Sequence, residues 1–407
     1  MVRSMRSPTR ALALATLAFT TCFYSWALLG PLAPGLQQQL RLSEVQVGWM
    51  VAIPVVMGSV MRIPMGIVTD RFGARRTFPI LMILSALPLA ALAVWHQSFW
   101  SLVVFGFLLG LAGSSFAVGV PFVSRWYAGR SQGAALGIYG MGMGGTVLAA
   151  LTAPTIADRL GYAAPFVLGA VLLVGVGALF GWAAREAPAT APAPANALES
   201  LTVFRRDPRA WALTLFYFLA FGGFVAMFLY LPKLLVGVYG LGKTDAAARA
   251  AGFALLAVLA RPLGGWLADR IGARSVLLIS FAAGAVLAAA LTGFYQQIAP
   301  LTAACLCLGV AFGLGTGAVF KMVGEEFPGS VGAVTGVVGA AGGLGGFFPP
   351  IVLGTVKAAT GSYALAFLLL AATAVACLAV LTLMGGRSSA GGQPVGPGEA
   401  RAAGGSS

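Results

Sequence analysis

Two arginines lie within hydrophobic stretches of this 407-residue chain, and each of them opens the same pattern. Arg62 begins the run RIPMGIVTDRFGAR, and Arg261 begins the run RPLGGWLADRIGAR, so the two runs align without a gap at an offset of 199 residues. A permanent cation inside the hydrocarbon layer of a membrane costs several kcal/mol and is rarely kept without a task. The pair therefore predicts a duplicated chain that carries one functional cation in each half.

The composition is that of an integral membrane protein. Hydrophobic residues make up 59% of the chain, charged residues only 9%, and the mean hydropathy is +0.92. A soluble domain carries roughly 25% charged residues. The net charge of +14 would favour a nucleic-acid partner in a soluble protein, but here the cations lie mainly in short loops. We therefore interpret them as topology signals and expect no nucleic-acid binding.

Hydrophobic stretches of about 20 residues, the length that crosses a bilayer, recur twelve times. They lie at 11–30, 45–69, 77–95, 99–126, 133–157, 162–184, 209–232, 246–268, 276–296, 298–320, 331–357 and 361–385. This predicts an all-α membrane protein of 12 transmembrane helices in two six-helix pseudo-repeats, at 1–184 and 209–385. A polar, Ala-Pro-rich linker at 185–208 joins the halves, and the Gly/Ser-rich tail at 386–407 is predicted to be disordered.

The distribution of cations predicts the orientation. With the N-terminus inside, seventeen Lys and Arg residues fall on cytoplasmic segments and six on outer segments. Short cytoplasmic loops of membrane proteins are enriched in these residues. We expect a multi-pass protein of the bacterial inner membrane with both termini in the cytoplasm.

The depth of the two arginines predicts an anion site. Arg62 lies eight residues before Asp70, and Arg261 lies eight residues before Asp269, which places each about 12 Å inside its helix end. The alternative is that each arginine pairs with a buried carboxylate, but every Asp and Glu falls in a loop or near a helix end. A guanidinium cannot lose its charge, and its forked donors match flat oxyanions. We expect a small anion to bind between the halves.

The loop that follows each arginine resembles the cytoplasmic loop motif of the major facilitator superfamily. The motif reads Gly-x-x-x-Asp-Arg-x-Gly-x-Arg, and the resemblance implies that it helps to latch an inner gate. Aspartate is unfavourable at the C-terminus of its own helix and could instead face the N-terminus of the helix at 331 or at 133. A simple topology anchor is the alternative. The residues predicted to act in gating are Asp70, Arg71, Gly73, Arg75, Asp269, Arg270 and Gly272.

Glycine ladders mark the stretches 133–157 and 331–357. In the first stretch, Gly140 and Gly144 belong to a series of glycines that are four, three and four residues apart. Gly339 and Gly343 belong to a series with the same spacing in the second stretch. Such glycines share one helix face and let two backbones approach closely. The ladders predict either tight static packing or a sliding seam that is used in gating.

Longer motifs narrow the resemblance to the nitrate/nitrite porter family of the same superfamily. They are FYSWALLGPLAP at 23–34, GSVMRIP at 58–64, FGGFV at 221–225, GTGAVFK at 315–321 and GAAGGLGGFFP at 339–349. The resemblance covers about residues 10–385. It implies the major facilitator fold and secondary active transport of nitrate and/or nitrite by alternating access. It implies no enzyme activity and no cofactor.

The resemblance also implies roles for single residues. Arg62 and Arg261 match the two arginines that clamp the anion, while Phe116 and Phe221 match rings that sandwich it. Tyr217, one turn before Phe221, matches a tyrosine that hydrogen-bonds the ion. Each of these aromatic residues has packing within the bundle as its alternative role.

One position departs from the family pattern. The usual Gly-Asn-x-Gly reads Gly-Met-Gly-Gly here, with Met143 in the place of the asparagine. The polar contact that the asparagine would make to the substrate is therefore either missing or made by another residue. Thr146 is the candidate for that residue.

The coupling mechanism is predicted from what the spans lack. No carboxylate lies deep in a span, and the single histidine, His96, falls at a helix end. Proton symport usually needs a titratable group in the pathway. We therefore favour exchange of nitrate for nitrite, with proton-coupled symport or transport of another small anion as alternatives. A multidrug–proton antiporter would need a membrane-embedded carboxylate. A sensor would need a signalling domain, and a membrane enzyme would need a catalytic cluster; we expect neither. We also expect no metal site, and we expect the protein to be a monomer.

Overall fold

The computed structural model describes residues 7–127, 131–187 and 199–388, and within these ranges it is entirely helical. The first half contains α1 (Ser7–Ala27), α2 (Leu29–Leu40), α3 (Glu44–Val60), α4 (Arg62–Phe72), α5 (Ala74–Trp95), α6 (Phe99–Leu109), η1 (Gly110–Ser114), α7 (Ser115–Trp126), α8 (Gln132–Gly140), η2 (Met141–Gly144), α9 (Gly145–Leu160) and α10 (Ala163–Ala183). The second half contains η3 (Glu199–Thr202), α11 (Val203–Arg206), α12 (Pro208–Tyr217), η4 (Phe218–Gly223), α13 (Phe224–Tyr239), α14 (Lys243–Ile271), α15 (Ala273–Phe294), α16 (Ile298–Glu326), α17 (Val331–Thr360) and α18 (Ala364–Ser388).

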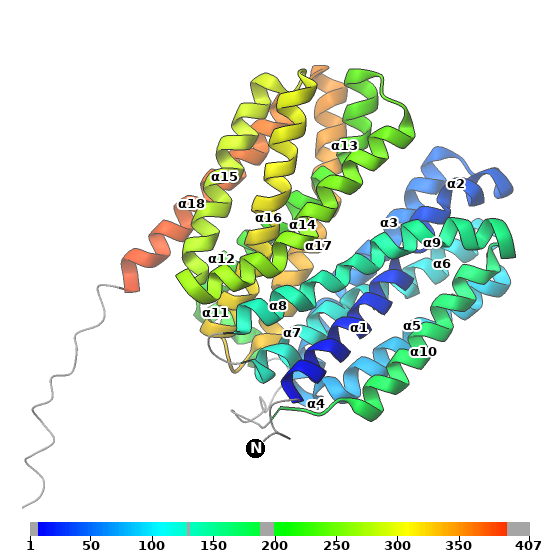
Figure 1. Ribbon diagram of the computed structural model, residues 1–407, viewed down its shortest axis with the longest axis horizontal. Helices are drawn as coiled ribbons and strands as arrows, with labels where there is room; N and C mark the ends of the chain where they lie inside the picture. The colour runs from blue at the N-terminus through cyan, green and yellow to red at the C-terminus, as the bar shows by residue number, and fades with distance from the viewer. Residues whose placement is uncertain (1–6, 128–130, 188–198, 389–407) are drawn as a thin grey trace, which may run out of the picture.

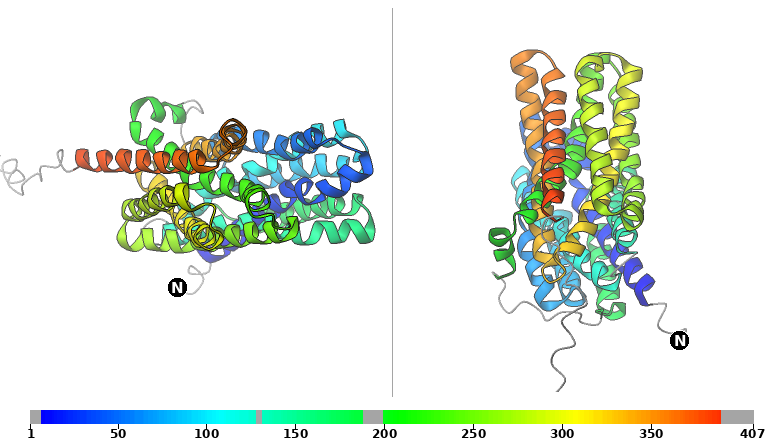
Figure 2. Two further views of the ribbon diagram at one scale, coloured as in Figure 1. Left: turned by 90° about the horizontal axis from the view of Figure 1, so that it is seen from above. Right: turned by 90° about the vertical axis from the view of Figure 1, so that its left-hand side faces the viewer.

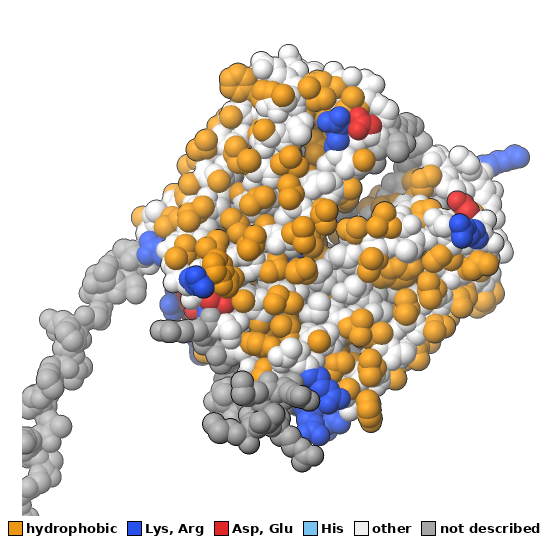
Figure 3. Space-filling view, viewed as in Figure 1, with side chains coloured by type: hydrophobic (Ala, Val, Ile, Leu, Met, Phe, Trp, Pro, Cys, Tyr) orange, Lys and Arg blue, Asp and Glu red, His pale blue; other side chains and the backbone are white. Residues whose placement is uncertain are grey.

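Joined across their breaks, these helices make the twelve predicted spans, and the predicted fold class is confirmed. Among the described residues, eleven helices are long and apolar enough to cross a membrane, and Val331–Gly346 is a shorter apolar helix. Figure 3 shows hydrophobic side chains over the flanks of the bundle, with charged side chains near the helix ends. Such a surface suits a lipid environment.

The two halves meet at one end of the molecule and separate toward the other (Figure 1). We call the end where they meet the linker end, because α4, α11 and the N-terminal side of α1 lie there. Contacts between the halves come from α8 against α14 and α16, and from α17 against α3, α4 and α7. The helices of the two halves therefore pack together toward the linker end and diverge toward the far end.

Several predicted spans are longer or more broken than expected. The first was predicted to end at residue 30, but α2 continues it to Leu40 after a break at Leu28. The break has a covalent cause, because Pro31 has no N–H to donate to the carbonyl four residues earlier. The fifth span is interrupted by the 3₁₀ turn η2, and the seventh by the π-helical turn η4. Both breaks fall in glycine-rich segments, where helical hydrogen bonding is weakest.

The predicted linker contains more structure than its composition indicated. Its first residues bind the first half: Glu186 accepts a hydrogen bond from the backbone N–H of Arg75 at 2.6 Å, and Trp126 donates to the carbonyl of Arg185 at 3.1 Å. Its last residues form η3 and α11. Residues 188–198 of the linker and 389–407 of the predicted tail lie outside the described residues, and residues 386–388 complete α18.

Candidate anion site between the two halves

Arg62 and Arg261 lie at equivalent places in the two halves, and each reaches across to the other half. Their exposed fractions are 5% and 4%. Nη1 of Arg62 donates to the carbonyl of Gly339 on α17, and Nη1 of Arg261 donates to the carbonyl of Gly140 on α8 at 3.2 Å. Arg62 has a further partner in its own half, since its Nε donates to the carbonyl of Gly113 at 3.2 Å. The two arginines that are 199 residues apart in the sequence therefore make equivalent contacts, related by the pseudo-symmetry of the two halves.

The glycine opposite each arginine leaves little space for a side chain. A Cβ atom added to Gly140 would lie 3.3 Å from Nη1 of Arg261, and one added to Gly339 would lie 3.2 Å from Cδ of Arg62. Both distances are tighter than ordinary van der Waals contact, so any larger side chain would displace the guanidinium. These two ladder glycines therefore position the arginines as well as allowing the helices to approach.

Phe221 lies against both guanidinium groups. The Cζ atom of Arg62 is 5.7 Å from the centre of this ring, and the Cζ atom of Arg261 is 5.4 Å from it. A cation near an aromatic face is stabilised by the ring quadrupole. The ring belongs to η4, and turns of this kind are often found at functional sites. The predicted proximity of Phe221 to the arginine pair is thus present in the structure.

The other predicted rings extend from Phe221 as a parallel stack. Tyr217 lies 5.1 Å from Phe221 with an interplanar angle of 1°, and Phe116 lies 6.3 Å from Tyr217 with an angle of 8°. Phe320 packs edge-on against both Tyr217 and Phe116, at 4.6 and 4.7 Å. The structure therefore joins Phe116 and Phe221 through Tyr217, whereas the sequence predicted that the two phenylalanines would face each other across the ion.

The arginine pair has no carboxylate partner among the described residues. None of the ion pairs in the described part of the chain includes Arg62 or Arg261. The two guanidinium groups repel each other, and Nη2 of Arg261 is buried without a hydrogen-bond partner. Tyr217 lies close enough to Arg261 to interact with it electrostatically. The site therefore holds two positive charges and a donor that is not satisfied, which is the electrostatic complement of an anion.

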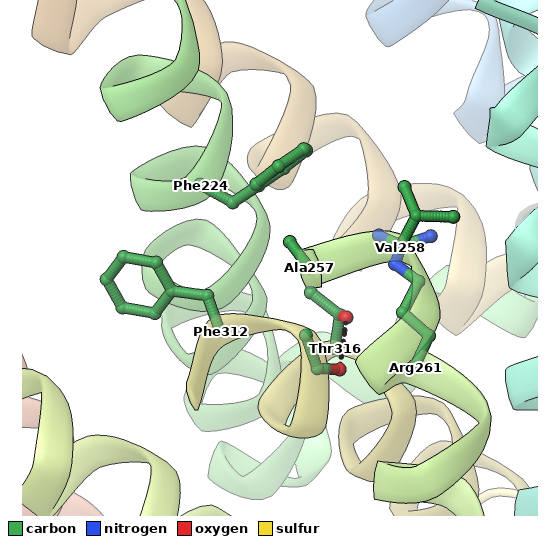
Figure 4. Close-up of a pocket in the computed structure, with 7 residues that line it drawn as sticks. Phe224, Ala257, Val258, Arg261, Phe312 and Thr316 are labelled. Atoms are coloured by element: carbon green, nitrogen blue, oxygen red, sulfur yellow. Dashed lines mark hydrogen bonds between the residues drawn. The ribbon is translucent and has the colours of Figure 1, made fainter. Parts of the chain in front are cut away.

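A small cavity adjoins this unsatisfied donor (Figure 4). Its lining residues come from α13, α14 and α16, and they are Phe224, Ala257, Val258, Arg261, Phe312, Gly313 and Thr316. Arg261 therefore borders this space on the side of its own half.

The two residues predicted around the missing asparagine lie in and beside η2. Met143 is buried, and its carbonyl accepts a hydrogen bond from the Thr146 hydroxyl at 2.8 Å. The described contacts of Thr146 therefore stay within its own span. A role for either residue in substrate binding stays a prediction.

The aspartate of the first loop motif caps a helix of the other half. The carboxylate of Asp70 accepts from the backbone N–H groups of Gly332 at 3.1 Å and Ala333 at 2.9 Å, at the start of α17. Nη2 of Arg125, on α7 of the same half, donates to the carboxylate at 3.0 Å. A carboxylate at a helix N-terminus is stabilised by the unpaired N–H groups and by the helix dipole.

The second copy of the motif repeats this arrangement. Asp269 accepts from the N–H groups of Gly133 at 2.8 Å and Ala134 at 2.7 Å, at the start of α8. Nζ of Lys321, on α16, lies 3.1 Å from Asp269 and 3.1 Å from Glu325. The side chain of Lys321 is 4% exposed, whereas that of Arg125 is 32% exposed. Both aspartates therefore join the two halves at the linker end. The cation that pairs with the aspartate from its own half is an arginine in the first contact and a lysine in the second.

Glycines allow the backbones beside each aspartate to touch. A Cβ added to Gly66 or Gly332 would overlap the carbonyl oxygen of the other residue, and the same holds for Gly133 and Gly265. By contrast, a Cβ added to Gly144 would have no atom within 4 Å. For Gly343 the nearest atom would be the Ser59 hydroxyl. The close seam therefore involves the linker-end part of each ladder, and Gly144 takes no part in it here.

The remaining motif residues form the turns at the linker end. Gly73 and Gly272 have φ values of +79° and +86°, which only glycine adopts easily, so the predicted tight turns are confirmed. Arg71 and Arg270 each lie over an aromatic ring of their own helix, at 5.3 and 4.1 Å from its centre. Nε of Arg75 donates to the end of α10, at the carbonyl of Gly181, at 3.3 Å.

Sequence reasoning missed three side chains that the structure brings to these sites. Arg125 was counted only as a topology signal, and Lys321 as a topology signal and a letter of a motif, although each pairs with a motif aspartate. Phe320 was noted only as a letter of a motif, although it completes the aromatic cluster. A signal for the two cations was available, because each lies near the linker end of its predicted span and can reach an aspartate there.

Two pseudo-symmetric helical halves that enclose a charged site between them, with helix caps that close one end, define a membrane transporter of the alternating-access class. A sequence profile described as the Major Facilitator Superfamily matches residues 15–350 and 243–403. The chain belongs to this superfamily, and it is a multi-pass membrane protein.

Curated relatives that align with nearly the whole chain are named as transporters of nitrate or nitrite. The chain is 41% identical over 378 residues to the probable nitrate/nitrite transporter NarK2 of Mycobacterium tuberculosis, and the alignment covers 92% of this chain and 96% of that protein. It is 36% identical over 376 residues to the nitrite extrusion protein of Bacillus subtilis, which covers 92% and 93%. It is 36% identical over 374 residues to the probable nitrate transporter NarT of Staphylococcus haemolyticus, which covers 91% and 95%.

Solved structures support the fold alone. The human organic anion transporter MFSD10 superposes with a TM-score of 0.75 at 16% identity, and it covers 92% of this chain and 99% of that chain. The proton:xylose symporter XylE gives 0.74 at 14% identity, with 92% and 95% covered. The transporter FucP in its outward conformation gives 0.71 at 18% identity, with 92% and 99% covered.

Proposed function

We propose that this protein transports nitrate and nitrite across the cell membrane by alternating access. The observation that carries the proposal is the pair of buried guanidinium groups, Arg62 and Arg261, which have no carboxylate partner among the described residues. The relatives' names, which specify nitrate and nitrite, agree with a site for a small flat anion. A planar oxyanion matches the forked donors of two arginines better than a spherical halide does.

The clamp has distinct parts. Arg62 and Arg261 bind the anion from opposite halves, and the face of Phe221, which lies against both guanidinium groups, limits its thickness. Phe116 supports Tyr217 from the side away from Phe221. The Tyr217 hydroxyl, which is close to Arg261, donates a hydrogen bond to the anion. The anion would replace the interactions that each guanidinium now makes with Phe221 and with a glycine carbonyl.

The mechanism that fits this geometry is exchange. Two like charges in a region of low dielectric constant repel strongly, so bringing the halves together around an empty site is costly. A bound anion lowers this cost, and the carrier then changes its open side only when it is loaded. A protein of this kind exchanges one anion for another, such as nitrate for nitrite, without net transport of charge.

The proposed sidedness follows from the cations of the short loops. The linker end would face the cytoplasm, with the N- and C-termini on that side. The aspartate caps and the glycine seam would then form the inner gate, which agrees with the hydrogen bonds that join the halves there. We propose that the monomer is the transporting unit, because both arginines and both caps belong to one chain.

Counterflow into proteoliposomes tests the proposal. Vesicles that contain the protein are loaded with nitrite, and uptake of labelled nitrate is measured with and without an internal anion and with and without a pH gradient. We expect uptake that needs internal nitrite or nitrate and is insensitive to the gradient. Robust uptake into anion-free vesicles driven by the pH gradient would reject exchange in favour of symport. Equal exchange of formate or chloride would reject the nitrate/nitrite assignment.

A further inference from the structure

The ordered end of the linker forms a small basic element on the flank of the bundle. The short helix α11 is attached to α12 by Trp211, whose indole N–H donates to the carbonyl of Phe204 at 2.7 Å. The two rings also pack edge-on at 5.2 Å, and Phe204 is buried. Figure 2 shows this segment beside the helices at the linker end rather than beneath them. In a membrane, the flank of a helix bundle at that level is surrounded by lipid headgroups.

This anchored element carries two adjacent arginines. Arg205 and Arg206 are both exposed, and neither is in an ion pair with a carboxylate that the structure describes. Trp211 is 56% exposed beside them. Tryptophan is enriched where a membrane protein crosses from hydrocarbon to headgroups. The exposed indole therefore indicates the depth at which the two cations lie.

Among the side chains that the structure describes, the nearby carboxylates already lie beside other cations. Asp207 caps α12 and binds Arg209, with Nη2 to Oδ2 at 2.6 Å, and Arg209 hydrogen bonds lower the pKa of Asp207. Nε of Arg209 also lies 3.8 Å from Glu326. Glu325, the next acid, is 3.1 Å from Lys321. The charges of Arg205 and Arg206 are consequently available to a partner outside the protein.

We propose that Arg205 and Arg206 bind the phosphate groups of anionic phospholipids, such as phosphatidylglycerol, in the leaflet at the linker end. Arginine donates forked hydrogen bonds to phosphate oxygens, and each cation at an anionic membrane surface contributes about 1 kcal/mol. The bound lipid holds α11 against α12, at the point where the linker enters the second half. This inference does not depend on which anion the protein transports.

Thermal unfolding of the purified protein in detergent tests the inference. The Tm is measured with phosphatidylglycerol, phosphatidylcholine or soluble glycerol phosphate for the unaltered chain, for R205Q/R206Q and for R41Q/R159Q. The last variant is the matched control, because it also loses two exposed cations, but at the far end of the bundle. A charge-preserving variant, R205K/R206K, reports whether the loss is electrostatic.

We expect phosphatidylglycerol to raise the Tm of the unaltered chain and of R41Q/R159Q, and phosphatidylcholine to raise neither as much. Two lost contacts should weaken lipid binding by R205Q/R206Q about 30-fold, and R205K/R206K should retain most of it. An undiminished phosphatidylglycerol shift in R205Q/R206Q would overturn the proposal. An equal shift with glycerol phosphate alone would overturn the lipid as the occupant.

Discussion

At the scale of single residues, the arginine pair dominates the site. Each guanidinium is oriented by a glycine carbonyl of the opposite half, and both share the ring of Phe221. They differ in one respect, because Arg62 has a second carbonyl partner whereas Nη2 of Arg261 has none. Arg261 therefore keeps a buried donor for a ligand in this conformation.

Replacing either arginine by lysine should stop transport while leaving the fold intact. Lysine keeps the charge but lacks the planar fork that offers a flat anion two parallel donors. We expect the exchange rates of Arg62→Lys and Arg261→Lys to fall by about 100-fold, the equivalent of losing charged hydrogen bonds of about 3 kcal/mol. Nitrate counterflow measures the loss, and gel filtration with thermal unfolding controls for folding. Wild-type exchange rates in either variant would contradict the site.

At the scale of helices, glycine sets how closely the halves approach. Gly137 on α8 faces the backbone of α14, where an added Cβ would lie 2.6 Å from the carbonyl oxygen of Arg261. Such an overlap with rigid backbone is relieved only if the helices separate. Gly144, later in the same ladder, has no such neighbour.

The two ladder positions should consequently respond differently to alanine. Gly137→Ala should destabilise the conformation that is closed at the linker end by about 1–3 kcal/mol, whereas Gly144→Ala should have little effect. Cross-linking of engineered cysteine pairs between α8 and α14 in native membranes would report the separation. If both variants cross-link as efficiently as the parent, the close seam is not what keeps this end shut.

At the scale of the whole molecule, two aspartates hold the halves together. Each carboxylate binds two N–H groups of the opposite half and one cation of its own half. The cation moves with the aspartate when the halves separate, whereas the helix N-terminus does not. The carboxylate therefore keeps one partner in the open state, which lowers the cost of opening.

Neutralising these carboxylates should favour the conformation that is open at the linker end. We expect Asp70→Asn and Asp269→Asn each to weaken the contact by about 1–2 kcal/mol, which shifts the conformational equilibrium about tenfold. The readout is labelling of a cysteine placed at Val334, a buried residue beside the Asp70 contact, by a thiol reagent supplied from the linker side. Asp245→Asn, an exposed acid on the far side, is the matched control. Unchanged labelling in both gate variants would contradict the latch.

The membrane class, the twelve spans and the two-fold duplication could all be predicted from the amino-acid pattern, because hydrophobic span length and a buried cation are local properties with few alternatives. The equivalence of Arg62 and Arg261 could be predicted in the same way. The position of Tyr217 between Phe116 and Phe221, and the pairing of Arg125 with Asp70 and of Lys321 with Asp269, required the folded structure. These contacts depend on the rotation and depth of helices far apart in the chain, and a change of one residue in a helix turns a side chain by about 100°. Periodicity along one helix cannot supply that rotation relative to its neighbours.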